Sequence, residues 1–333
     1  ILRWKVSLHA FGEDTGWARK ASEQIEDCIH DHDCLCWIPT SSIMAKPTPF
    51  QFKTLLVLGR MSNLPTVWSN LMLGWLMGQT EPSFEVLAWL CLGGSLIYTG
   101  GMYLNDAFDV RFDRSFRPER PIPSGAISLG WVRFLGWFQL VAGSVILSAG
   151  SQVALGWILA LNASVIAYNA FHKRMVFSPV MMAACRFFLL MAAYSAESGQ
   201  AWRGAALWPS FALGSYIVGL TYVAKRESTG GVIAWWPCLF LYFPILMAGF
   251  MHQSIHWLTL CLPAPAFLLW SLWCLRHIFW GSKNHIGRAV SGLLAGMPMV
   301  DMLFLSSQHP VWMLICAAWF LAALLFQRFV PAT

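Results

Sequence analysis

The sequence predicts an all-α polytopic membrane protein, and the composition and the pattern of apolar runs are the observations that predict it. Of the 333 residues, 57% are hydrophobic and 11% are charged, and the mean hydropathy is +0.56. A soluble globular chain is about a quarter charged. The apolar residues form long runs separated by short polar segments. We expect each run to be a helix, because lipid cannot satisfy the hydrogen bonds of an open backbone.

The candidate membrane spans are long enough to cross roughly 30 Å of hydrocarbon as helices. They cover residues 55–78, 84–105, 129–149, 152–170, 178–196, 205–222, 232–252, 256–279, 286–306 and 311–329. The run at 286–306 is the weakest of them, because it carries Arg288 and Asp301.

Residues 1–43 differ in composition from the rest of the chain. They are rich in acids, they lack the n-region and h-region of a signal peptide, and they precede the first methionine, Met44. Their run CIHDHDCLC, from Cys28 to Cys36, matches no common zinc-site spacing. We expect a disordered or non-native N-terminal extension here, followed by one membrane domain over residues 44–333.

The basic residues are concentrated in alternate loops. One set of loops includes 111–120, 173–174 and 225–226, whereas the opposite loops hold only Arg203. An excess of Lys and Arg marks the cytoplasmic side of a membrane protein. We therefore expect both ends in the cytoplasm, and the net charge of +6 does not indicate nucleic acid as a partner.

The stretch from Asn105 to Gly125 places charge between two apolar runs, where charge is expensive and indicates a site. Asp106, Asp109 and Asp113 follow the spacing i, i+3, i+7, so on a helix they lie along one face. Carboxylates this close together favour a bound cation. Oxygen ligands suit Mg²⁺, which also bridges to phosphates.

The charges around this stretch allow two interpretations. Lys173 and Arg174, in a loop on the same side, are suited to hold a diphosphate. The alternative is a solvated loop whose acids pair with its own arginines, which is reasonable for Arg111, Arg114 and Glu119. That alternative does not explain why three acids share one face at a membrane boundary.

Two charged residues lie inside predicted spans, Arg186 and Asp301. Intramembrane charges are functional by default, and a pair between these two is one possibility, with a structural polar contact as the other. Asn70 is placed either to contact an acceptor or to form a hydrogen bond between helices.

The segment NDAFDVRFDRSFRPERPIPSG, residues 105–125, resembles the first aspartate-rich motif of the UbiA family of intramembrane prenyltransferases, N-D-x-x-D-x-x-x-D followed by R-P-x-P-S-G. The segment YNAFHK at 168–173 resembles the tyrosine-and-lysine loop of that family, and GRMSNLPTVWSN at 59–70 resembles its first helix. The resemblance runs from about residue 55 to 306. Within the family, the chain looks most like the EboC-type and uncharacterised bacterial branch.

This resemblance implies a nine-helix bundle, with the run at 311–329 as a tenth helix. It implies Mg²⁺ held by Asp106, Asp109 and Asp113, which together with Lys173 make up the catalytic set. The Mg²⁺ binds an allylic prenyl diphosphate at the cytoplasmic mouth of a cavity, and a small lipophilic or aromatic acceptor captures the prenyl cation. The residues expected to bind the substrates are Asn70, Asn105, Arg117, Arg120, Tyr168, Arg174, Arg186, Tyr222, Lys225 and Glu227. The implied setting is the bacterial inner membrane, with an organelle membrane as the alternative.

The sequence departs from the family after the sixth span. The family has a second aspartate pair there, whereas this chain reads TYVAKRESTGG, in which Lys225 and Arg226 precede the single acid Glu227. This difference leaves open a second function, a protein that binds or transports a prenyl diphosphate without turnover.

Overall fold

The computed structural model describes residues 52–78, 83–173, 175–196, 204–229, 235–251, 260–280, 285–306 and 310–331. All the regular structure within these ranges is helical, and the prediction of an all-α polytopic membrane fold is confirmed. The predicted extension at 1–43 lies outside the described residues.

The first half of the fold contains the charged stretch. Its elements are α3 (Phe52–Leu58), the 3₁₀ turn η1 (Met61–Asn63), α4 (Leu64–Gly78), α5 (Phe84–Phe116), α6 (Leu129–Ser151), α7 (Leu155–Phe171) and α8 (Ser178–Tyr194). Two differences from the predicted spans affect the site. The first span is broken before Leu64, and α5 continues eleven residues beyond the predicted end at 105, so all three motif aspartates lie on a helix.

The second half completes the bundle. Its elements are α9 (Leu207–Thr229), the 3₁₀ turn η2 (Trp236–Leu241), α10 (Phe243–Met251), α11 (Pro263–Phe279), α12 (Ile286–Ala295), α13 (Met297–Leu305) and α14 (Pro310–Phe326). The span predicted at 286–306 is divided into α12 and α13 near Gly296, where Pro298 cannot donate the backbone hydrogen bond that a continuous helix requires.

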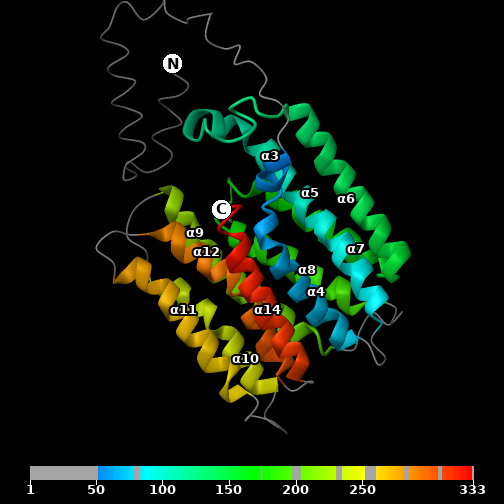
Figure 1. Ribbon diagram of the computed structural model, residues 1–333, viewed down its shortest axis with the longest axis vertical. Coiled ribbons are helices and arrows are strands. Elements are labelled where there is room, and N and C mark those ends of the chain that lie inside the picture. Colours follow the sequence, from blue (N-terminus) through cyan, green and yellow to red (C-terminus); the bar gives the residue numbers. More distant parts are fainter. Residues whose placement is uncertain are drawn as a thin grey trace, which may run out of the picture.

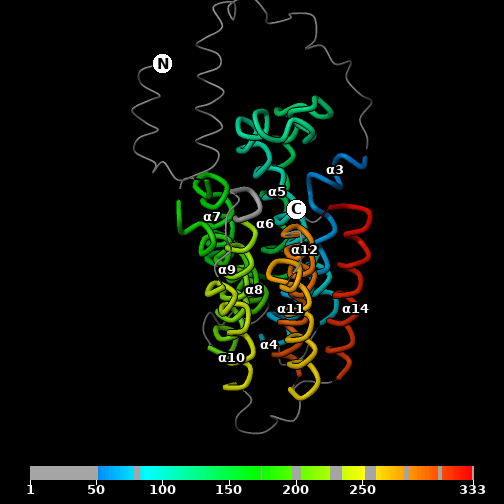
Figure 2. Tube along the Cα trace, turned by 90° about the vertical axis from the view of Figure 1, so that its left-hand side faces the viewer, coloured from blue at the N-terminus to red at the C-terminus, as the bar shows by residue number. Residues whose placement is uncertain are grey.

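Within the described residues, four segments are long and apolar enough to cross a membrane: Phe84–Phe116, Leu129–Ser151, Leu207–Lys225 and Ile286–Leu305. Figure 1 shows α5, α6 and α7 along one side of the bundle and α9, α11 and α12 along the other. Helix α4 lies between the two sides and contacts α5, α8, α13 and α14. Figure 2, turned by 90°, shows that the axes of most helices are roughly aligned, so the helices form an elongated bundle.

Glycines allow α5 and α6 to pack closely. A Cβ placed on Gly100 would lie 2.9 Å from the carbonyl oxygen of Gly136, and one on Gly143 would lie 2.7 Å from that of Gly93. Small residues at such contacts let membrane helices approach backbone to backbone. This tight pair holds the charged end of α5 in place.

Candidate functional site

The three motif aspartates at the charged end of α5 contact two separate sets of basic side chains. Asp106 and Asp113 are two turns apart, and both are buried. The chain turns back after Phe116, where the Arg117 N–H closes the helix on the Asp113 carbonyl. The turn brings Arg120 between the two acids: its Nη1 lies 3.1 Å from Asp106 Oδ1 and 3.2 Å from Asp113 Oδ2.

Asp109 contacts the second set, two basic side chains that follow α7. Its Oδ1 lies 2.8 Å from Lys173 Nζ, and its Oδ2 lies 3.4 Å from His172 Nε2. The Lys173 ammonium also lies 3.9 Å from the centre of the Phe112 ring. The structure therefore brings Lys173 to the acidic motif, as predicted, but it pairs Lys173 with Asp109 alone.

The three carboxylates were predicted to hold Mg²⁺ together. In the part of the chain that the structure describes, no group of three or more His, Cys, Asp or Glu side chains is placed to hold a metal ion. Asp106 and Asp113 do fit one cation between them, since a guanidinium already occupies that position. A divalent ion suits the same two hard oxygen donors once Arg120 withdraws, whereas Asp109 stands apart.

Arg60 lies in the break between α3 and α4, and its backbone is left-handed, with φ of 45° and ψ of 49°. A non-glycine residue there is strained, and such strain is concentrated at functional sites. The guanidinium lies 3.9 Å from Asp106 and also lines a central cavity. Arg60 thus connects the charged end of α5 to the interior of the bundle.

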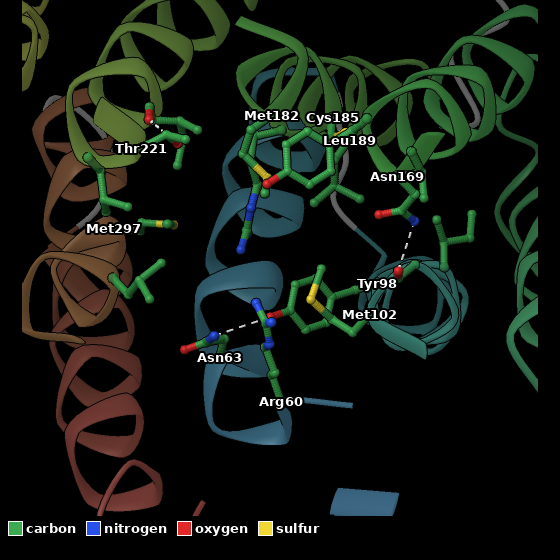
Figure 3. Close-up of a pocket in the computed structure, with 18 of the residues that line it drawn as sticks. Arg60, Asn63, Tyr98, Met102, Asn169, Met182, Cys185, Leu189, Thr221 and Met297 are labelled. Atoms are coloured by element: carbon green, nitrogen blue, oxygen red, sulfur yellow. Dashed lines mark hydrogen bonds between the residues drawn. The ribbon is translucent and has the colours of Figure 1, made fainter. Parts of the chain in front are cut away.

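The central cavity has a volume of about 210 Å³. It is bounded by the turn that precedes α4 and by helices α5, α7, α8, α9, α12 and α13. Its polar lining residues are few and include Arg60, Asn63, Tyr98, Asn169 and Arg186, and most of the remaining lining is aliphatic. Figure 3 shows the Asn63 amide directed at the Tyr98 hydroxyl, a hydrogen bond of 3.2 Å. An apolar cavity with a few convergent polar groups is the usual form of a small-molecule site.

Arg186 forms one wall of this cavity and is 7% exposed. It donates hydrogen bonds to the Thr66 carbonyl at 3.2 Å, to Thr66 Oγ1 at 3.0 Å and to Asn70 Oδ1 at 2.7 Å. Asn70 in turn donates to Asp301 Oδ2 at 2.7 Å, and Ser69 donates to the same oxygen. The two intramembrane charges are therefore linked through Asn70, which forms the predicted hydrogen bond between helices.

Other predicted residues have structural partners. Asn105 donates to Asn169 on α7 at 3.1 Å, and Asn169 donates to the Gly101 carbonyl at 3.0 Å. Tyr168 lines the cavity and stacks on His172, with ring centres 5.0 Å apart.

On α9, Tyr222 and Lys225 were predicted to bind substrate, and neither lines the central cavity. Tyr222 packs on Trp236, with ring centres 5.8 Å apart, and Lys225 Nζ lies 3.5 Å from the Met175 carbonyl. Arg174 and the side chain of Glu227 lie outside the described residues.

Sequence reasoning missed the roles of Arg60, Tyr98 and Asn169. Arg60 was interpreted only as a topology signal, although its place after Gly59 in the segment GRMSNLPTVWSN could have marked a break. Tyr98 and Asn169 are single polar residues in apolar helices, and only the packing of α5 against α7 brings them to the cavity.

Residues 63–279 match the UbiA prenyltransferase family. The chain belongs to this family. A digeranylgeranylglyceryl phosphate synthase of Metallosphaera sedula is 42% identical over 89 residues, which cover 27% of this chain and 30% of the relative. A 4-hydroxybenzoate octaprenyltransferase of Paracidovorax citrulli is 30% identical over 115 residues, 34% of this chain and 39% of the relative.

The matched segments thus span about a third of the length of these curated relatives. A solved structure from work on digeranylgeranylglyceryl phosphate synthase in membranes superposes with a TM-score of 0.52 at 14% identity, over 81% of this chain and 98% of that one. This likeness supports the fold alone. None of these relatives is named for the EboC-type branch, so the branch assignment stays a prediction.

Proposed function

We propose that this UbiA-family chain transfers a prenyl group from an isoprenoid diphosphate to a small lipophilic or aromatic acceptor in the membrane. The observation that carries the proposal is the contact between the charged end of α5 and the central cavity, made by Arg60. A prenyl diphosphate has two parts that match them: its anionic diphosphate suits the cations at the end of α5, and its apolar tail suits the cavity. We place the site on the cytoplasmic side of a bacterial inner membrane, on the distribution of basic loops.

The chain's cations would bind and neutralise the diphosphate. Arg60, Arg120 and Lys173 already face carboxylates at this end and are partly exposed. Asp106 and Asp113 would hold Mg²⁺, which when bound supplies positive charge to the leaving diphosphate. As the allylic C–O bond breaks, its electron pair leaves with the diphosphate, and fixed positive charge stabilises that change.

The central cavity would hold the reacting groups away from water. Tyr98 and Tyr168 line it, and aromatic faces stabilise a nearby cation. Arg186, oriented by Asn70, is available to a polar group of the acceptor. The acceptor then forms the new bond to the prenyl carbon and loses one proton.

The test is a set of labelled prenyl diphosphates of several chain lengths, given with Mg²⁺ to membranes that contain the chain, followed by lipid extraction and mass analysis. We expect a prenylated lipid and released diphosphate with the native chain and neither with Asp106→Ala. Absence of both products at every chain length would contradict the proposal.

A second function has its own support. Each motif aspartate is already paired with a cation of the chain, and the second motif is reduced to Glu227. A protein that binds a prenyl diphosphate for storage or transport would show saturable, Mg²⁺-dependent binding of the labelled donor without release of diphosphate in the same membranes.

A further inference from the structure

A second cavity lies further along α5, at its charged end, and shares Asn169 with the central cavity. We call it the outer pocket. It has a volume of about 510 Å³ and is lined by Leu104, Ala107, Phe108, Asp109, Val110, Arg111, Phe112, Arg133, Trp137, Asn169, Ala170, His172 and Lys173. Of this set, prenyl transfer as proposed above uses Lys173, which pairs with Asp109.

The outer pocket carries an excess of positive charge. Lys173 is balanced by Asp109 at 2.8 Å. Arg111 on α5 and Arg133 on α6 are exposed, and neither has an ion-pair partner among the described residues. Two guanidinium groups therefore face one pocket from neighbouring helices, and a guanidinium is suited to phosphate oxygens.

An apolar stripe begins at the same pocket. Trp137 lines the pocket, and the adjoining face of α6 carries Phe134, Phe138, Val141 and Val145 at helical spacing. The last four are 58%, 57%, 62% and 59% exposed. This exposure puts the stripe on the outer surface of α6, which Figure 1 shows at one edge of the bundle, where lipid would cover it.

We propose that the outer pocket binds an anionic phospholipid, with the headgroup phosphate held by Arg111 and Arg133 and an acyl chain lying along the α6 stripe. Charge complementarity selects a negatively charged headgroup over a zwitterionic one. The prenyl donor is the less suitable occupant, because the apolar surface beside the pocket is the exposed stripe of α6, and no residue of α6 lines the central cavity.

The test measures phosphatidylglycerol binding to the purified full-length chain in detergent, with phosphatidylcholine as the zwitterionic comparison. The variants are Arg111→Gln and Arg133→Gln. Arg114→Gln is the matched control, because Arg114 is also exposed on α5 without an ion pair among the described residues but does not line the pocket. The melting temperature of each variant in phosphatidylcholine confirms that it is folded.

We expect one saturable phosphatidylglycerol site whose affinity falls about fivefold in each pocket variant, the effect of one basic residue at a lipid surface. Arg114→Gln should stay within about twofold of the native chain, and phosphatidylcholine binding should not respond to any of the variants.

Three results would overturn the proposal. An equal loss of phosphatidylglycerol affinity in all three variants would indicate that the lipid responds to general surface charge and not to this pocket. Complete displacement of the lipid by millimolar inorganic phosphate would indicate a site for a free anion. Displacement by farnesyl diphosphate at one equivalent, with weaker farnesyl diphosphate binding in the pocket variants, would assign the pocket to the prenyl donor.

Discussion

The charged end of α5 and the buried network around Arg186 both neutralise acids with arginine, but they do so differently. At the end of α5, Arg120 contacts Asp106 directly and its side chain is 18% exposed. In the buried network, Asn70 lies between Arg186 and Asp301, and Asp301 is 0% exposed. The first arrangement lets water and a ligand replace the arginine, whereas the second cannot exchange partners without breaking the bundle. We therefore expect exchange of ionic partners at the end of α5, whereas the contact of Asn70 with Asp301 holds the helices in position and orients Arg186 at the cavity wall.

The largest expected effect comes from removing an acid at the end of α5, where a ligand can replace the arginine partner. Asp106→Ala should lower prenyl transfer by about 10⁴-fold, ~5.5 kcal/mol of transition-state stabilisation, because it removes one of the two oxygen donors for the cation. Rates of product formation in membranes measure the loss. Glu119→Ala is the control, since Glu119 is an exposed acid of the following loop with no ion pair among the described residues. Equal losses in both variants would show that Asp106 has no special role.

Substitutions in the buried network should lower the stability of the fold. Asp301→Ala leaves Arg186 without its countercharge and should lower the free energy of unfolding by about 3–5 kcal/mol. Ser69→Ala removes only one donor to the same carboxylate and should cost about 1 kcal/mol. Unfolding in mixed detergent, followed by Trp fluorescence, measures both. A stable Asp301→Ala protein that has lost activity would instead assign the network to the chemistry.

Removal of the cation that pairs with Asp109 should have a smaller effect. Lys173→Met removes a charge that would contact the diphosphate and should lower kcat/KM for the donor by about 30-fold, ~2 kcal/mol. Lys53→Met, at the exposed start of α3, should stay within about twofold. If Lys173→Met left kcat/KM for the donor unchanged, Lys173 would serve only to balance Asp109.

The sequence predicts some of these features and not others, for physical reasons. Helix α6 was predicted to within two residues, because a long apolar run follows Ser128, whose side chain caps the helix by accepting from the Trp131 N–H. The charged extension of α5 was missed, since hydropathy ends a span where charge begins. The pairing of Arg120 with Asp113 depends on the path of the loop after Phe116, and the spacing of residues in the sequence does not predict that path.

The smallest expected effect tests whether a metal ion replaces Arg120 between the two carboxylates. If Arg120 occupies the position of a metal ion between Asp106 and Asp113, Arg120→Gln removes a competitor for those oxygens. The Mg²⁺ concentration for half-maximal activity should then fall about threefold, ~0.6 kcal/mol, within the range of a partly exposed ion pair. Arg117→Gln removes a neighbouring charge that has no ion pair with an acid among the described residues, and it should leave that concentration unchanged. A higher Mg²⁺ requirement in Arg120→Gln would mean that the guanidinium holds the carboxylates in place for the ion, and the two arginine arrangements would then share a positioning role.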